Sequence, residues 1–335
     1  MVWWRRCLRM LGIGLSILLL SLLTIWATAA LYFDLPVAWL RLPLALVYVL
    51  GMIASVVLLR TRWTRTLIVG AGFLLVLAWW LSLRPSNERP WQPDVAKRAW
   101  AEIEGDRVTI HNLRNCDYRT ETDYTPRWET RTFDLRKLRG VDVFLTYWGS
   151  PWIAHPIVSF DFGDGNYVPI SIEVRKQVGE SYSAVRGFFR QYELIYIVSD
   201  ERDVVRLRSN YRTGEDVYLF HTKASPDQAR SLFLEYLERV NRMRDHPEWY
   251  NAITNNCTTN ITVHAAAARD ALPRWDWRIL LNGRSDQMLY ERGDLAGDLP
   301  YPELKQKALI NPAARAANDD PDFSKRIRAG RPGFQ

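Results

Sequence analysis

A cysteine at the start of a predicted helix is the residue of this sequence best placed for nucleophilic chemistry. Cys257 follows Asn255 and Asn256, which are favourable N-cap residues, and apolar residues then recur at helical spacing until Pro273. In a first turn, unpaired N–H groups and the positive end of the helix dipole favour a thiolate over a thiol. Cys257 is therefore an activated nucleophile, a half-buried structural cysteine or one half of a disulfide, and the local sequence leaves these open.

A thiolate nucleophile needs a histidine within reach, and the chain has five. His264 lies about 10 Å beyond Cys257 along the same helix, so we expect that it cannot reach the thiol. His155 opens an apolar, alternating segment shortly after the break at Gly149-Ser-Pro151. It is either a catalytic imidazole or a histidine whose partners lie within the core.

The predicted hairpin that contains His155 also supplies a carboxylate. Residues 152–162 and 167–174 alternate as strands on either side of a Gly-Asp-Gly-Asn turn. Pairing about this turn brings the stretch around Glu173 opposite His155, although a shift of one residue would exchange the faces. Glu173 is then a candidate to orient the imidazole, with Arg175 as its neighbour. The alternative is a surface Glu–Arg pair.

Three apolar runs near the N-terminus predict membrane spans. Residues 11–33 are long enough to cross a bilayer, and residues 42–59 and 66–83 have about the minimum length. Arginines precede the first run and separate the second from the third, at Arg5, Arg6, Arg9, Arg60, Arg62 and Arg65. The positive-inside rule then places the N-terminus in the cytoplasm and the chain after Arg84 on the outer face. A cleaved signal peptide in place of the first span is the alternative.

The charge balance argues against a nucleic-acid partner. The 335-residue chain has a net charge of +7, but residues 1–83 hold seven Arg and one acid and account for +6 of it. The basic charge therefore belongs to the membrane end, and the rest of the chain has no dense basic patch. Three cysteines are too few for a disulfide framework. We expect no metal and no cofactor.

The remainder of the chain predicts an α+β layout. A polar, Pro-containing linker over 84–94, at most about 36 Å long, connects a three-helix anchor at 1–83 to an outer domain at 95–335. Besides the hairpin and the Cys257 helix, the patterns predict a short helix within 91–104, a strand over 107–112, a strand or helix over 141–148, strands over 192–199 and 217–221 with a charged turn at 200–203, and helices over 226–242 and 286–292.

Several segments within residues 107–330 resemble the bacterial Lnb N-terminal periplasmic domain family. They are Tyr147-Trp-Gly-Ser-Pro, His155-Pro-Ile-Val-Ser-Phe, Ile170-Ser-Ile-Glu-Val-Arg, Arg190-Gln-Tyr-Glu-Leu-Ile-Tyr, Asp200-Glu-Arg-Asp-Val, Trp249-Tyr-Asn and Asn255-Asn-Cys-Thr-Thr. The resemblance implies a membrane-attached, envelope-facing protein. The family's named member moves an acyl chain onto the N-terminal lipid-modified cysteine of lipoproteins. Cys257 and His155 match the family's cysteine and histidine, whereas Glu173 is inferred from the hairpin alone.

More distantly, a strand histidine followed by an Asn-Cys helix start resembles circularly permuted papain-like enzymes such as lecithin:retinol acyltransferase. We therefore expect three transmembrane helices followed by a papain-like, circularly permuted α+β domain in the periplasm. The expected function is a thiol acyltransferase or hydrolase of the bacterial inner membrane that acts on phospholipid or lipoprotein. Cys257 attacks the carbonyl, and its N–H with an Asn255 or Asn256 amide stabilises the oxyanion.

Two alternatives remain at this point. One is an amidase or peptidase that acts on cell-wall peptide. The other is a non-catalytic envelope module in which Cys257 forms a disulfide with Cys116 in an oxidising compartment.

Overall fold

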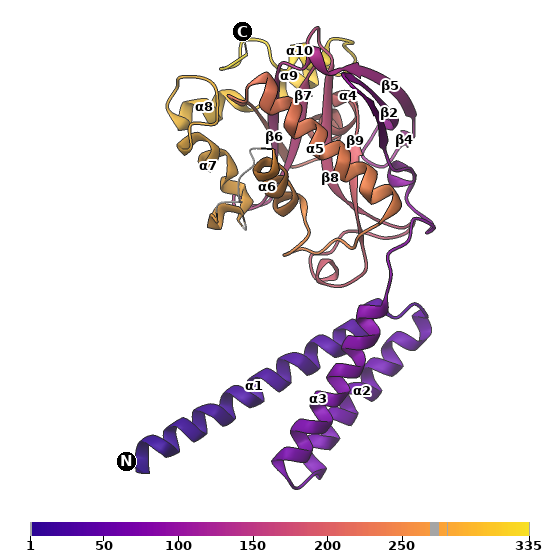
Figure 1. The fold of residues 1–335 in the computed structure, drawn as a ribbon, viewed down its shortest axis with the longest axis vertical. Helices are drawn as coiled ribbons and strands as arrows, with labels where there is room; N and C mark the ends of the chain where they lie inside the picture. The colour runs from indigo at the N-terminus through magenta and orange to yellow at the C-terminus, as the bar shows by residue number, and fades with distance from the viewer. Residues whose placement is uncertain (1, 269–274, 280, 335) are drawn as a thin grey trace. The chain divides into compact units, whose positions relative to one another are not determined.

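The computed structural model describes residues 2–268, 275–279 and 281–334, and its chain forms two units (Figure 1). The membrane unit comprises Met1–Pro85 together with Ser183–Tyr192, and the outer unit comprises Ser86–Tyr182 and Glu193–Gln335. The chain therefore passes between the two units more than once.

The membrane unit contains three helices that are long and apolar enough to cross a bilayer. They are α1 (Val2–Asp34), α2 (Ala38–Leu58) and α3 (Arg62–Ser82). Thr61 caps α3 by accepting a hydrogen bond from the Thr64 N–H, which fixes the turn between the second and third spans. The prediction of three apolar helices is confirmed.

A short segment from the middle of the sequence packs on this unit. The Phe189 ring lies 5.0 Å from the Phe33 ring, and both belong to an apolar cluster with α1 and α3 residues. Asp34, at the end of α1, accepts hydrogen bonds from the Arg190 N–H at 3.1 Å and from Gln191 Nε2 at 2.8 Å. We call residues 183–192 the docked segment. Its place in the membrane unit was not predicted from the sequence.

The outer unit is built on a five-stranded antiparallel sheet of order β10-β6-β7-β8-β9. Its strands are β6 (Gly140–Trp148), β7 (Ala154–Asp161), β8 (Tyr167–Arg175), β9 (Glu193–Val198) and β10 (Glu215–His221). A tight turn with positive φ at Gly163, Asp164 and Gly165 joins β7 to β8. The predicted hairpin is confirmed, and the segment at 141–148 is a strand.

Two smaller sheets lie in the N-terminal part of the outer unit. One has the order β1 (Trp100–Glu104), β2 (Arg107–Arg114), β5 (Trp128–Asp134), and the other pairs β3 (Asp117–Tyr118) with β4 (Tyr124–Thr125). The predicted helix within 91–104 is therefore wrong. Only Pro93–Val95 makes a helical turn, of the 3₁₀ type, and the following residues pair with β2 as a strand.

The main sheet is covered by helices (Figure 1). The helix α5 (Pro226–Asp245) begins with a capping box between Ser225 and Gln228 and packs Phe233 on Phe160 of β7. Elsewhere α4 (Glu201–Arg206), α9 (Asn311–Ala316) and α10 (Phe323–Arg326) contribute to an apolar cluster with Phe144 and Ile157 of the sheet. The α+β class is confirmed.

Two further predictions need correction. The charged turn at 200–203 is the start of α4, because Asp200 caps this helix by accepting a hydrogen bond from the Arg202 N–H. Most of the predicted linker at 84–94 is bound to the outer unit: the Ser86 N–H donates to Glu193 at 2.6 Å, and Trp91 forms a β-bridge with Gln177.

Candidate active site

Cys257 is the first residue of α6 (Cys257–Ala267), as the sequence predicts. The Asn256 side chain caps this helix by accepting hydrogen bonds from the N–H groups of Thr258 and Thr259, and the Thr259 hydroxyl accepts one from the Asn256 N–H. The thiol is half-buried and free. The helix start therefore holds Cys257 in a fixed position with its sulfur still accessible.

His155 lies near the beginning of β7, and a hydrogen bond with the Cys257 thiol contributes to the raised pKa of its imidazole. The imidazole Nε2 also lies 2.7 Å from Ser171 Oγ and 3.1 Å from Glu173 Oε1. The β7–β8 pairing explains this geometry: Ile157 is opposite Ser171, so continuing the register by two residues brings His155 opposite Glu173. The structure thus brings together Cys257, His155 and Glu173.

Ser171 was not singled out from the sequence. Its hydroxyl donates to Glu173 Oε1 at 2.7 Å and lies within hydrogen-bonding distance of the His155 ring. The side chain is fully buried, so this contact is shielded from water. Because Ser171 and Glu173 are two residues apart on one strand, they project from the same face as His155. The alternation of polar and apolar residues in β8 was the available signal.

Arg208 is the cation that pairs with Glu173. It lies in η4 (Leu207–Tyr211), a π-helical turn that follows α4, and its guanidinium donates to Glu173 at 2.9 Å and to Glu215 at 3.3 Å. The predicted neighbour, Arg175, instead donates to the carbonyls of Val95 and Ala96. Local spacing could not reveal Arg208, because η4 and β8 are far apart in the sequence.

The charges around His155 favour an imidazolium. Burial alone would lower the pKa of His155, but the Glu173 carboxylate and the hydrogen bonds that the ring makes to Cys257 and Glu173 outweigh burial and the Arg208 cation, so the pKa is raised. Burial would likewise raise the pKa of Glu173, but His155 and Arg208 hold it well below its ordinary value. An ionised Glu173 therefore faces a His155 that retains its proton to higher pH.

An asparagine amide connects the two halves of the site. Asn282 Oδ1 accepts from the Ala154 N–H at 2.8 Å, and its Nδ2 donates to the Ala154 carbonyl at 2.6 Å and to Thr258 Oγ1 at 2.5 Å. Ala154 precedes His155, and Thr258 follows Cys257. The Asn282 side chain therefore fixes the separation of the imidazole and the thiol without touching either. The sequence gave no indication of this role.

The two predicted oxyanion residues have different amounts of hydrogen-bonding capacity left. Asn255 Nδ2 donates to Glu248 at 3.2 Å and to the Trp249 carbonyl at 2.9 Å, which occupies both of its N–H groups. Asn256 Nδ2 donates to the Ala252 carbonyl at 2.9 Å, and an amide nitrogen has a second N–H to offer. Of the two side chains, Asn256 is the better candidate donor.

Cys116 and His264, in the same unit as Cys257, make other contacts. Cys116 is a buried free thiol packed with Tyr118 and Leu207, and burial and the Asp203 carboxylate raise its pKa to about 12. All three cysteines, Cys7, Cys116 and Cys257, are free, so the disulfide of the non-catalytic alternative is not formed in this structure. His264 contacts the Tyr196 hydroxyl at 2.7 Å, two helical turns from Cys257.

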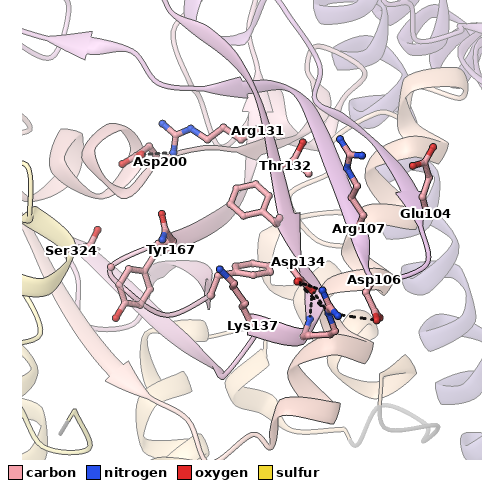
Figure 2. A pocket seen from close by; sticks show the side chains of 15 residues that line it. Glu104, Asp106, Arg107, Arg131, Thr132, Asp134, Lys137, Tyr167, Asp200 and Ser324 are labelled. Carbon is pink, nitrogen blue, oxygen red and sulfur yellow. Dashed lines mark hydrogen bonds and ion pairs between the residues drawn. The ribbon is translucent and has the colours of Figure 1, made fainter.

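A polar hollow of about 880 Å³ is separate from the thiol site (Figure 2). It lies beside β5 and the β7–β8 turn, and two of its arginines are paired with acids: Arg131 with Asp200 at 2.7 Å, and Arg136 with Asp134 at 2.7 Å. No nucleophilic cysteine lines it. Within the described part of the chain, no group of three or more His, Cys, Asp or Glu side chains is arranged to hold a metal ion.

The comparisons with known proteins give one family match. The model of the Lnb N-terminal periplasmic domain matches residues 124–283, which include β6 to β10 and the start of α6 and therefore His155, Glu173 and Cys257. Neither the curated proteins nor the solved structures contain a significant match. Residues 124–283 therefore match the Lnb N-terminal periplasmic domain family, and three helices that are long and apolar enough to cross a membrane precede them.

Proposed function

We propose that this protein is a Cys-dependent acyltransferase or hydrolase that acts on the acyl groups of membrane lipids or lipoproteins. The observation that carries the proposal is the position of His155: its Nε2 lies 3.1 Å from the Glu173 carboxylate, and Asn282 bonds both to Ala154, which precedes it, and to Thr258, which follows Cys257. A hydrogen bond with Cys257 also contributes to the raised pKa of the imidazole. A nucleophile, a base and a group that orients the base are the three parts needed for nucleophilic catalysis.

Each part has a defined step in the proposed reaction. His155 accepts the thiol proton, the Cys257 sulfur attacks the ester or amide carbonyl, and the oxyanion accepts hydrogen bonds from the Cys257 N–H and the Asn256 amide. Imidazolium then protonates the leaving group, and a thioester remains on Cys257. In the second half, His155 removes a proton from an incoming amine or water, which releases the acyl group. Because Nε2 faces Ser171 and Glu173, the Nδ1 atom is the one that exchanges protons.

The membrane anchor supports a lipid-linked substrate. Of the predicted linker, Ser86 and the residues after it bond to the outer unit, which leaves Leu83, Arg84 and Pro85 after the end of α3. Three residues span at most about 10 Å, so the catalytic unit stays near the bilayer. We place α1–α3 in the bacterial inner membrane with a cytoplasmic N-terminus, because six arginines flank their predicted inner ends.

Reporter fusions test this topology. A reporter that is active only in the periplasm should be active when fused after Arg84 and inactive when fused within the Arg60–Arg65 loop. The opposite pattern would place the thiol site in the cytoplasm and remove the basis for a periplasmic reaction.

The order of the catalytic elements also supports a papain-like, circularly permuted architecture. The histidine lies on a strand that precedes the cysteine helix in the chain, with a carboxylate on the neighbouring strand. This is the reverse of an arrangement in which a helical cysteine comes first. The site chemistry does not depend on the relationship, since it follows from the positions of the side chains.

Mass spectrometry of the full-length protein after incubation with native membrane lipids tests the function directly. We expect the mass of one acyl chain on the peptide that contains Cys257, its removal by hydroxylamine, and none on the Cys257→Ser variant. His155→Ala should accumulate little of this thioester. A cell-wall amidase would instead be acylated by peptidoglycan fragments and not by lipid, and that result would replace the present proposal.

A further inference from the structure

We propose that apolar side chains around the Cys257 site form a surface that contacts the acyl region of the bilayer holding α1–α3. The rim consists of Trp152, Ile153, Tyr182, Ile253, Trp277 and Leu281, each between 42% and 55% exposed. This surface is independent of the proposed chemistry, because it concerns where the outer unit binds and not what Cys257 does.

The rim residues belong to segments that converge on the site. Trp152 and Ile153 directly precede Ala154 and His155, and the Trp152 carbonyl accepts a hydrogen bond from the Gly283 N–H at 2.9 Å. The approach is close, since a Cβ on Gly283 would meet the backbone of residues 151–153 at 2.6 Å or less. The loop at 148–153 is therefore packed against the segment that carries Leu281.

The remaining rim residues approach from the cysteine side. Ile253 lies in the turn just before α6, where its N–H donates to Asn251. The side chains of Tyr182 and Tyr250 are hydrogen-bonded to each other, which connects the segment that follows β8 to the loop before α6. Leu281 precedes Asn282, the residue that bonds to Thr258. The thiol thus has exposed apolar groups on several sides.

In the outer unit, exposed apolar side chains are concentrated around the Cys257 site. The other large ones among the described residues of the outer unit include Trp148, Val178, Val263 and Trp275, which lie on the rim segments or on α6. Ile103, on β1, lies apart from them and is 43% exposed. Contiguous apolar surface of this kind marks a site of interaction, whereas a single exposed residue is ordinary.

Chain connectivity identifies a bilayer as the occupant. Tyr182 is bonded directly to Ser183, the first residue of the docked segment, which packs with α1 and α3. The rim is therefore continuous in the chain with a part of the protein that belongs to the membrane unit. Its mixture of tryptophan, tyrosine and aliphatic side chains is also the composition that partitions into the interface between lipid and water.

Site-directed spin labelling of the full-length protein in phospholipid vesicles tests the proposal. The starting protein carries Cys7→Ser and Cys257→Ser, and Cys116 remains because burial and its raised pKa protect it from labelling. A nitroxide is attached to Trp152→Cys or Ile253→Cys, and Ile103→Cys is the matched control with similar exposure on another face. The measurement compares collisions with oxygen, which partitions into lipid, and with a water-soluble nickel chelate.

We expect the ratio of oxygen to nickel collisions to be several-fold higher at positions 152 and 253 than at position 103. Equal, water-like ratios at all three positions would overturn the proposal. Labels at 152 and 253 that neither reagent reaches would indicate a protein partner or a second copy on the rim, and would also overturn it. Since these proteins lack the catalytic thiol, a negative result leaves the acyl-transfer proposal standing, and failure of that proposal leaves this one intact.

Discussion

Replacing Glu173 by Gln removes a negative charge from His155 while it keeps the size of the side chain. In the wild type, Glu173 Oε1 lies 3.1 Å from His155 Nε2 and helps to raise the pKa of the imidazole. Protonation of a leaving group requires imidazolium, so activity should fall as pH rises through the pKa of His155. In the Glu173→Gln variant this alkaline fall should occur at lower pH.

The size of the shift follows from the contact distances. Two unit charges 3.1 Å apart attract by roughly 5 kcal/mol at an effective dielectric constant of about 20. Water screens part of this attraction, because the Glu173 side chain is 24% exposed. Loss of this attraction should lower the pKa of His155, and the Arg208 cation that remains nearby acts in the same direction.

The assay is the pH profile of kcat for release of an alcohol from an acyl ester. Glu215→Gln is the control, because Glu215 also pairs with Arg208, at 3.3 Å, but lies beyond it from His155. Its alkaline limb should move by well under one unit. Equal shifts in the two variants would show that general loss of charge, and not the Glu173–His155 contact, controls the profile, and the orienting role of Glu173 would be withdrawn.

Three further outcomes are expected. Cys116→Ser should retain most of the activity, measured as ester turnover, because this buried thiol is separate from the site; loss of activity together with a mapped Cys116–Cys257 disulfide would contradict the reasoning. Burial lowers the pKa of His264 to about 3, so between that value and pH ~6.5 the unfolded chain binds this proton and the folded chain does not. The free energy of unfolding should therefore fall with decreasing pH by up to about 1.4 kcal/mol per pH unit. In denaturant titrations at pH 7 and pH 5, His264→Gln should lose less stability than the wild type. Asn282→Ala should lower kcat by about 10- to 100-fold, because the imidazole would be misplaced. Thr258→Val removes only one of the three Asn282 hydrogen bonds and should have a smaller effect. Equal effects would show that Asn282 does not position His155 and Cys257.

The strand pair that carries His155 and Glu173 could be predicted because its constraints are local. A short glycine-rich turn fixes the hairpin register, and the register alone brings His155 opposite Glu173. The start of α6 could also be predicted from the sequence, since Asn256 has the side chain that an N-cap needs. At both places the residues that determine the structure are close to the residues that they position.

The parts that could not be predicted depend on contacts between distant segments. The helix expected within 91–104 is replaced by β1, because pairing with β2 satisfies its backbone and outweighs local propensity. Arg208 and Asn282 reach the site from η4 and from the segment before α7 (Ser285–Glu291). The helices α8 (Tyr301–Ala308), α9 and α10 are short, so periodicity gave a weak signal.

Because of the docked segment, the membrane unit and the outer unit are not interchangeable modules. If residues 1–85 were deleted, Phe189 would lose the aromatic cluster that buries it, and Arg190 and Gln191 would lose the carboxylate of Asp34. A version without the membrane helices would therefore expose an apolar, aggregation-prone loop between β8 and β9 unless that loop were redesigned as well. In evolution, exchange of this anchor for another would require matching changes at residues 183–192, about a hundred positions further along the gene. The two parts are expected to be inherited together.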